Sequence, residues 1–164
     1  MPETDLVCKE VTVKLVQKRN IKYQLNSPSR VVDIARKVIT QNDREHLVVL
    51  CLDVKKHLNS VNLAHVGSLN STPASPREIF KVAILSNAAS IICVHNHPSG
   101  DPTPSEEDRH VAQALREIGA MLDIDLVDFI ILGDWAFSFA EEGLLPVVPK
   151  IEKVKRNANG VDAV

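Results

Sequence analysis

Two histidines, a serine and an aspartate lie within one short segment of the chain, and side chains of these types together can bind zinc and assist hydrolysis. Residues 95–108 have the sequence His-Asn-His-Pro-Ser-Gly-Asp-Pro-Thr-Pro-Ser-Glu-Glu-Asp. The apolar run at residues 89–94 predicts a buried strand that ends at the histidines. Because side chains alternate along a strand, His95 and His97 share a face, with Cα atoms about 6.6 Å apart. Two imidazoles at this spacing can bind one ion.

The helix predicted after this segment carries a carboxylate on its apolar side. The apolar residues of that helix recur at steps of four, three and four: Val111, Leu115, Ile118 and Leu122. Asp108 extends the same stripe by one step. A carboxylate that faces the interior costs free energy unless it is paired or binds a metal, so we expect Asp108 to join the two histidines. Two neutral imidazoles and one carboxylate leave the fourth tetrahedral position of zinc to water, as in catalytic zinc sites.

Ser105 and Asp108 also have the spacing of a helix capping box, in which each side chain bonds to the backbone of the other residue. That structural role is an alternative explanation for the pair, although Ser105 can cap the helix and still serve a site. Cys93 shares the histidine face by alternation, so a metal contact is open there. Burial in the strand is the simpler explanation for this cysteine.

The arrangement of His95-x-His97, Ser105 and Asp108 resembles the JAMM signature of MPN-type metalloproteases, and the wording of the segment resembles the RadC family in particular. Further matches are Pro-Arg-Glu-Ile-Phe at 76–80, Asn-Ala-Ala at 87–89 and Ser-Phe-Ala-Glu-Glu-Gly-Leu at 138–144. The resemblance covers about residues 27–145. It implies an α/β domain of the MPN type, which is similar to cytidine deaminases, and a zinc-dependent hydrolase.

Two departures from the RadC pattern bear on function. Members of that family usually carry an N-terminal helix-hairpin-helix module that contacts nucleic acid, and at 164 residues this chain is expected to be a stand-alone catalytic domain without one. Where the family typically has Asp-His in a late strand, this chain has Asp128-Phe129. Asp128 lies within an apolar run, so we expect either a partner for a ligand histidine or an exposed position on the strand.

JAMM enzymes also use an upstream glutamate, and two residues of this chain are eligible. Glu78 follows Ser75-Pro76 with the spacing of a capping box, which already explains it structurally. Glu45 follows a helical pattern and stands at the head of the apolar run 47–52, which resembles the family's order of helix, glutamate and strand. We therefore favour Glu45 as the catalytic base, with a solvated loop position as its structural alternative.

The chemistry that the resemblance implies is the hydrolysis of an amide bond. Zinc lowers the pKa of a bound water from about 15.7 toward about 7, which makes hydroxide available at neutral pH. Glu45 would accept the proton of that water and later pass it to the leaving amine. Ser105 would donate a hydrogen bond to the developing oxyanion. The products, a carboxylate and an amine, indicate a peptidase or an isopeptidase with a peptide or protein substrate.

The elements that must position these residues follow a mixed α/β order. Strands are predicted near 11–16, 45–52, 61–69, 89–94, 126–132 and 136–139, and helices begin at Ser27-Pro28, Ser75-Pro76 and Ser105. Helices on both faces of one mixed sheet would bury it. We expect one domain over residues 1–149 and a flexible tail over residues 150–164.

The composition agrees with one globular domain. The chain is 45% hydrophobic and 24% charged, which is ordinary for a protein with a full core. It has no apolar run long enough to span a bilayer, and no basic segment followed by an apolar one at its start, so we expect a cytoplasmic protein without a membrane partner. Three widely spaced cysteines, Cys8, Cys51 and Cys93, argue against a disulfide framework.

Two other functions stay open. The RadC name is tied to DNA repair, which makes a nucleic-acid-associated protein the second hypothesis. A net charge of −2, one Trp and one Tyr offer phosphates and bases little to bind, and the notable basic cluster lies in the tail, at Lys150, Lys153, Lys155 and Arg156. The third hypothesis is a metal-free binding module that has kept the fold. A homodimer is also open, and loops at 67–75 and 133–136 are expected to select the unidentified substrate.

Overall fold

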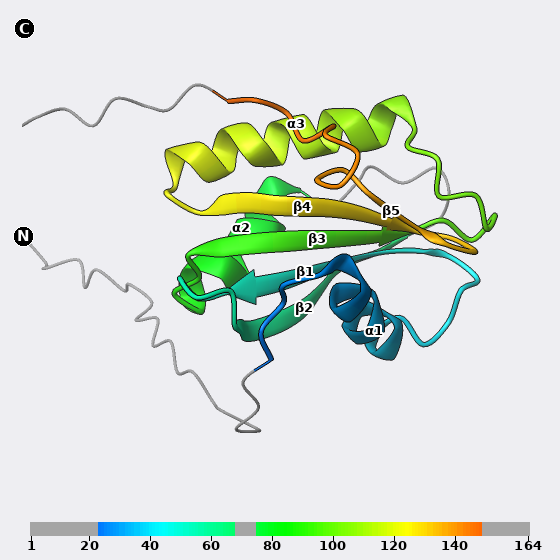
Figure 1. The fold of residues 1–164 in the computed structure, drawn as a ribbon, viewed down its shortest axis with the longest axis horizontal. Coiled ribbons are helices and arrows are strands. Elements are labelled where there is room, and N and C mark those ends of the chain that lie inside the picture. The colour runs from blue at the N-terminus through cyan, green and yellow to red at the C-terminus, as the bar shows by residue number, and fades with distance from the viewer. Residues whose placement is uncertain (1–22, 68–74, 149–164) are drawn as a thin grey trace, which may run out of the picture.

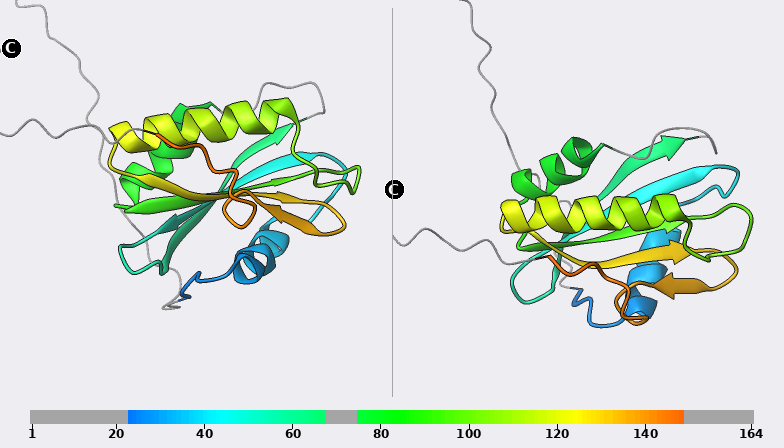
Figure 2. Two further views of the ribbon diagram at one scale, coloured as in Figure 1. Left: turned by 45° about the horizontal axis from the view of Figure 1, so that its top comes forward. Right: turned by 90° about the horizontal axis from the view of Figure 1, so that it is seen from above.

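The computed structural model describes residues 23–67 and 75–148. Its elements in chain order are α1 (Pro28–Val38), β1 (Glu45–Leu52), β2 (Leu58–Gly67), α2 (Pro76–Leu85), β3 (Ser90–Asn96), α3 (Glu106–Met121), β4 (Asp125–Leu132) and β5 (Ala136–Ser138). The strands form one five-stranded sheet, with α1 on one face and α2 and α3 on the other (Figures 1 and 2). This architecture confirms the expected fold class, a mixed sheet flanked by helices on both faces.

The strand order β2-β1-β3-β4-β5 places β3 at the centre of the sheet, with β1 beside it. Both strands are almost continuously apolar and buried, as expected for strands covered on both faces. β1 is antiparallel to β3 and sets Leu47 beside His95, while β4 is parallel to β3 and sets Ile131 on the other side of His95. The end of β3 therefore lies close to the start of β1, where Glu45 stands.

Alternation along the strands divides the apolar side chains into two cores. The first core contains Phe129 of β4 and lies against α2 and α3. The second contains Ile130 and is covered by α1 through Val31 and Ala35. His95 belongs to the face of the first core, because Cys93 two residues earlier is part of that core.

The stripe that α3 turns inward has a different phase from the predicted one. The buried residues of the helix are Asp108, Ala112, Leu115 and Gly119. Leu115 is buried as predicted, and Val111 and Ile118 pack half-buried against the core, but Leu122 is 40% exposed, so the prediction is wrong for Leu122. Small residues let the helix end pack closely, since a Cβ on Gly119 would lie 2.4 Å from the carbonyl oxygen of Ile124.

The other predicted elements are found with shifted ends. β2 begins at Leu58, earlier than the predicted start at residue 61. The strand expected at 11–16 and the tail at 150–164 lie outside the described residues, so the domain boundaries stay predictions. Within residues 23–67 and 75–148, no helix has the length and apolar character needed to cross a membrane.

Candidate metal centre

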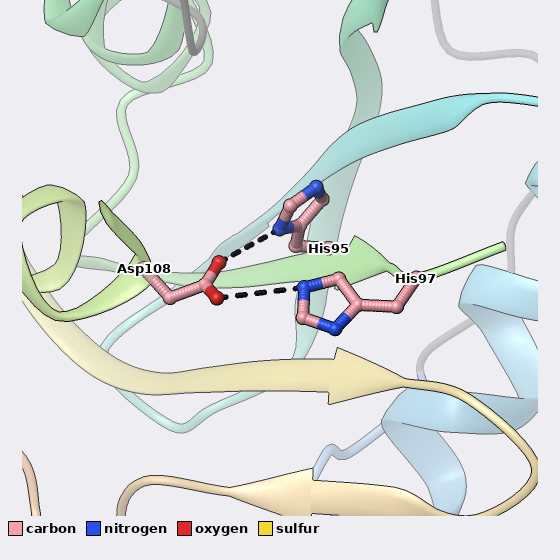
Figure 3. Close-up of side chains that lie close together, drawn as sticks. All are labelled: His95, His97 and Asp108. Carbon is pink, nitrogen blue, oxygen red and sulfur yellow. Dashed lines mark hydrogen bonds and ion pairs between the residues drawn. The ribbon is translucent and has the colours of Figure 1, made fainter. Parts of the chain in front are cut away.

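The two histidines lie where β3 runs into a proline-rich loop. His95 is the second-last residue of β3, and His97 extends the strand pairing by one bond, from its N–H to the carbonyl of Leu132 (2.7 Å). Pro98 has no N–H and ends the pairing there. The two imidazole rings lie near each other, perpendicular and 5.0 Å apart between centroids, as the alternation of side chains predicts (Figure 3).

Asp108 comes from the first turn of α3 and points at both histidines (Figure 3). Its Oδ1 is 2.9 Å from Nδ1 of His95, and its Oδ2 is 3.4 Å from Nε2 of His97. The aspartate side chain is only 4% exposed, so the predicted inward direction is confirmed.

Ser105 and Asp108 also form the predicted capping box. The hydroxyl of Ser105 accepts a hydrogen bond from the N–H of Asp108 (3.1 Å). In return, Oδ2 of Asp108 accepts from the N–H (2.8 Å) and from the hydroxyl (2.6 Å) of Ser105. The carboxylate of Asp108 therefore caps the helix and contacts both histidines at the same time.

These contacts decide the charge of the group. Burial alone would raise the pKa of Asp108, but hydrogen bonds from His95, His97 and Ser105 outweigh burial and hold that pKa well below its ordinary value. The hydrogen bond with Asp108 in turn raises the pKa of His97. The carboxylate of Asp108 is therefore ionised at neutral pH and attracts a cation.

The loop after His97 fixes the orientation of its ring. Nδ1 of His97 is 2.8 Å from the carbonyl oxygen of Asp101, which can only accept, so Nδ1 carries the hydrogen. Nε2 then donates to Asp108 only in the protonated ring, whereas in the neutral ring its lone pair is available to a metal ion. An outer hydrogen bond of this kind is typical of metal-binding histidines. Asp101 is itself held by the N–H and the hydroxyl of Thr103 (2.9 and 2.6 Å).

The three side chains fit a metal ion. One potential ligand atom from each of His95, His97 and Asp108 lies within 4.8 Å of the other two. Two imidazole nitrogens and one carboxylate oxygen are donors that zinc accepts, and three protein ligands leave one tetrahedral position open. The group could therefore hold a metal ion.

Glu45 approaches the same group from the start of β1. Its Oε2 lies 3.5 Å from Nε2 of His95, and its side chain is 27% exposed. Glu78, the other candidate base, is half exposed on α2 and pairs with Lys81 (3.0 Å). The capping box expected at Glu78 is wrong, because the side chain of Ser75 makes no capping hydrogen bond. The structure thus brings Glu45, and not Glu78, to the histidines.

A cavity of about 290 Å³ is lined by these residues and by several that the motif does not indicate. Its apolar wall contains Leu47, Val111 and Phe129, from β1, α3 and β4, and its polar lining includes His65 of β2 and Glu107 of α3. Leu47, His65 and Phe129 have no spacing that relates them to the histidines, whereas Glu107 and Val111 lie beside Asp108 in the sequence. The strand pairing and the packing of α3 bring them together, which only the folded structure shows.

Two further expectations concern the surroundings of the site. The hairpin at 133–136 does not line this cavity; it supports the histidine loop instead. A Cβ on Gly133 would lie 2.2 Å from the carbonyl oxygen of Gly100, which also accepts a hydrogen bond from the N–H of Asp134 (2.7 Å). Cys93 is fully buried, burial raises the pKa of its thiol, and it does not belong to the metal-binding group, which confirms burial as the simpler explanation for this cysteine.

Asp128 is neither a partner of a ligand histidine nor an exposed strand residue, so both predicted alternatives are wrong. It is only 5% exposed, and it pairs across the sheet with Ile92 of the second core, on the face opposite His95. Its carboxylate accepts hydrogen bonds from the hydroxyl of Ser138 (2.7 Å) and the N–H of Ala140 (3.0 Å). Asp128 therefore holds the turn after β5 and does not contact a ligand histidine.

Comparison with known proteins gives consistent matches. Residues 25–144 match the family of RadC-like JAB domains. A UPF0758 protein of Shouchella clausii is 42% identical over 125 residues, which are 76% of this chain and 54% of that protein. Similar proteins of Roseiflexus castenholzii and Bacillus licheniformis, also named UPF0758, are 42% identical over 129 residues (78% and 55%) and 50% identical over 103 residues (62% and 46%). The chain thus spans about half the length of the curated relatives it matches.

Proposed function

Because this chain belongs to the family of RadC-like JAB domains, we propose that it is a zinc-dependent hydrolase of the metallopeptidase or isopeptidase type, which cleaves an amide bond in a peptide or protein. The observation that carries the proposal is the meeting of a potential ligand group and a glutamate around one cavity: His95, His97, Asp108 and Glu45. Gathering several titratable groups in a half-buried place costs desolvation free energy, and a bound cation would offset that cost.

His95, His97 and Asp108 are the proposed holders of the zinc ion. When bound, zinc supplies a Lewis acid that polarises a carbonyl group and lowers the pKa of water. The chain's own contribution is to keep the donors oriented: Asp101 orients His97, and Ser105 orients Asp108. These outer hydrogen bonds hold the ligand atoms toward one another before any ion arrives.

Glu45 is the proposed general base. It lies beside His95 without belonging to the ligand group, and its carboxylate is partly exposed on the cavity side. From there it can accept a proton from the attacking water and deliver that proton to the leaving nitrogen. Both transfers occur at the same carboxylate, which starts and ends the cycle ionised.

Ser105 is proposed to stabilise the tetrahedral oxyanion. Its hydroxyl bonds to Oδ2 of Asp108, but the N–H of Ser105 bonds to the same oxygen (2.8 Å). The hydroxyl can therefore turn to a substrate oxygen while the carboxylate keeps one donor. A donor aimed at the place where negative charge develops lowers the activation free energy.

A glutamine at position 45 tests the proposal. The zinc-loaded protein is screened against peptide and isopeptide libraries, and zinc content is measured by elemental analysis. We expect Glu45→Gln to keep its zinc and to lose about 100- to 10,000-fold in hydrolysis. The matched control, Glu78→Gln, changes an exposed glutamate of α2 and should keep both zinc and activity.

Two outcomes would contradict the proposal. Full activity in Glu45→Gln would place the base elsewhere. A wild-type protein that binds no zinc would favour the metal-free binding module. The basic cluster behind the nucleic-acid hypothesis lies at 150–156, outside the described residues, so that hypothesis and the homodimer stay predictions.

A further inference from the structure

The side chain of Asn96 joins the histidine strand to the segment that carries Glu45. The backbone pairing of β1 with β3 ends at Leu47 and His95, before it reaches Glu45. Beyond that point the side chain of Asn96 takes over the contact between the two strands. Asn96 lies between the two histidines, points to the opposite face of the sheet and is only 2% exposed.

Asn96 bonds to the backbone on both sides of Glu45. Its Oδ1 accepts a hydrogen bond from the N–H of His46 (2.7 Å), and its Nδ2 donates to the carbonyl oxygen of Arg44 (3.1 Å). Nδ2 also donates to Oδ1 of Asn42 (2.7 Å). Both the oxygen and the nitrogen of the Asn96 amide therefore form hydrogen bonds with the segment that carries Glu45.

We propose that Asn96 is a positioning residue that fixes Glu45 relative to the metal-binding group, an inference that rests on the proposed function. On its other side, Glu45 pairs with Gly67 of β2, a strand that supplies none of the three ligands. Asn96 instead belongs to the same tripeptide as His95 and His97, so the ligands and the support of the base move as one unit. A displacement of about 1 Å at a reacting group can cost about 100-fold in rate.

A side-chain amide matches both groups of this contact. The His46 N–H needs an acceptor, and the Arg44 carbonyl, which also lies 2.9 Å from Nδ1 of His46, takes a second donor from Asn96. An apolar side chain at position 96 would leave the His46 N–H without this acceptor and the Arg44 carbonyl with one donor fewer. An aspartate would keep the acceptor for His46 but turn a second oxygen toward the carbonyl of Arg44.

The first experiment measures the anchoring itself and needs no activity. Amide exchange of His46 is followed by NMR in the zinc-free protein. In Asn96→Ala we expect roughly two- to tenfold faster exchange at His46, because that N–H loses its acceptor. Asn42→Ala, which removes only the outermost bond, should leave His46 unchanged. Unchanged exchange in Asn96→Ala would overturn the inference.

The second experiment separates positioning from general stability. In Asn96→Ala we expect kcat to fall up to about 100-fold with KM and zinc affinity within about twofold of wild type. In a Glu45→Gln background the same change should cause no further loss, because Asn96 acts through Glu45. Losses that multiply in the double variant, or a parallel loss of zinc affinity, would overturn the inference.

Two further variants keep the test decisive. If alanine at this buried position prevents folding, Asn96→Asp is used, and we expect normal exchange at His46 with reduced kcat. Unchanged kcat in that variant would overturn the inference. Asp128→Asn is the matched control. It changes a buried side chain of similar size on the same face of the sheet as Asn96 but away from Glu45, so kcat should be unchanged.

A wild-type protein that cleaves nothing would contradict the proposed function, while the exchange of the His46 amide would still test the anchoring by Asn96.

Discussion

Two aspartates on opposite faces of the sheet are equally buried and accept similar hydrogen bonds, yet their pKa values are shifted in opposite directions. Asp108 at the start of α3 is 4% exposed, and Asp128 in β4 is 5% exposed. Each accepts a hydrogen bond from a serine hydroxyl and from a backbone N–H. Yet the pKa of Asp108 lies well below the ordinary value, whereas burial raises the pKa of Asp128.

The difference comes from the two imidazoles. Asp108 faces His95 and His97, which favour its ionised form, while Asp128 has neutral donors and the nearby Glu141 carboxylate, which disfavours ionisation. Neutral donors are enough to satisfy a buried carboxyl group, but they do not overcome the desolvation of a charge. Of the two aspartates, Asp108 is therefore the one whose surroundings favour a negative charge that can bind a cation.

The strongest test of this comparison exchanges each aspartate for asparagine. Asp108→Asn removes the ionised ligand, so we expect zinc affinity to fall by more than about 100-fold, beyond the range typical of outer hydrogen-bonding partners, and hydrolysis to disappear. Asp128→Asn should bind zinc as the wild type does. Competition titration with a chromophoric chelator measures both. Equal affinities in the two variants would break the comparison.

A smaller effect is expected from the two serines. Ser105→Ala removes the cap hydroxyl and the proposed oxyanion donor, so it should cost about 1 kcal/mol of unfolding free energy and lower kcat about 100-fold. Ser138→Ala deprives Asp128 of a donor and should cost about 1–3 kcal/mol of unfolding free energy without changing kcat. Urea unfolding and steady-state kinetics on both variants provide the data. If Ser105→Ala loses stability but no activity, Ser105 is a cap and nothing more.

The smallest effect concerns pH. Because burial raises the pKa of Asp128, the folded protein holds its proton more tightly than the unfolded chain. The stability gained in this way is complete below the ordinary aspartate pKa of about 3.9 and is lost as pH rises through the raised folded value. The unfolding free energy of the wild type, relative to Asp128→Asn, should therefore fall with rising pH in that window. Urea titrations with a chelator present measure it, and a difference that increases with pH would contradict the assignment.

The metal-binding group could be predicted because it is local in the chain. His95 and His97 follow from the alternation of a strand, and Asp108 follows from the helical stripe after a short loop. Each step spans a few residues and uses one periodicity. The same locality explains the limit of the α3 prediction: hydrophobicity selected Leu122, whereas the small side chains of Ala112 and Gly119 decide which face packs closely.

The other parts of the site depend on pairing between strands that are distant in the chain, and the periodicity of the sequence does not predict that pairing. The sequence favours Glu45 over Glu78 through a family resemblance and through a capping box that Ser75 does not form. The antiparallel register of β1 with β3 is what brings Glu45 beside His95. His65 and Phe129 reach the cavity in the same way, from strands that carry no motif. For Asp128 both predicted positions are wrong, because the face of the sheet on which it lies depends on a register irregularity between β3 and β4.

The separation of ligands and base along the chain has a consequence for assembly. His95 and Asp108 are thirteen residues apart, so their meeting requires closure of one short loop, which is fast and costs little entropy. Glu45 reaches them only through the pairing of β1 with β3, a long-range contact that closes a much longer loop. A partly folded chain with a captured ion would therefore still lack its proton acceptor. On the proposed function, hydrolysis therefore requires the pairing of β1 with β3 as well as the closed histidine loop.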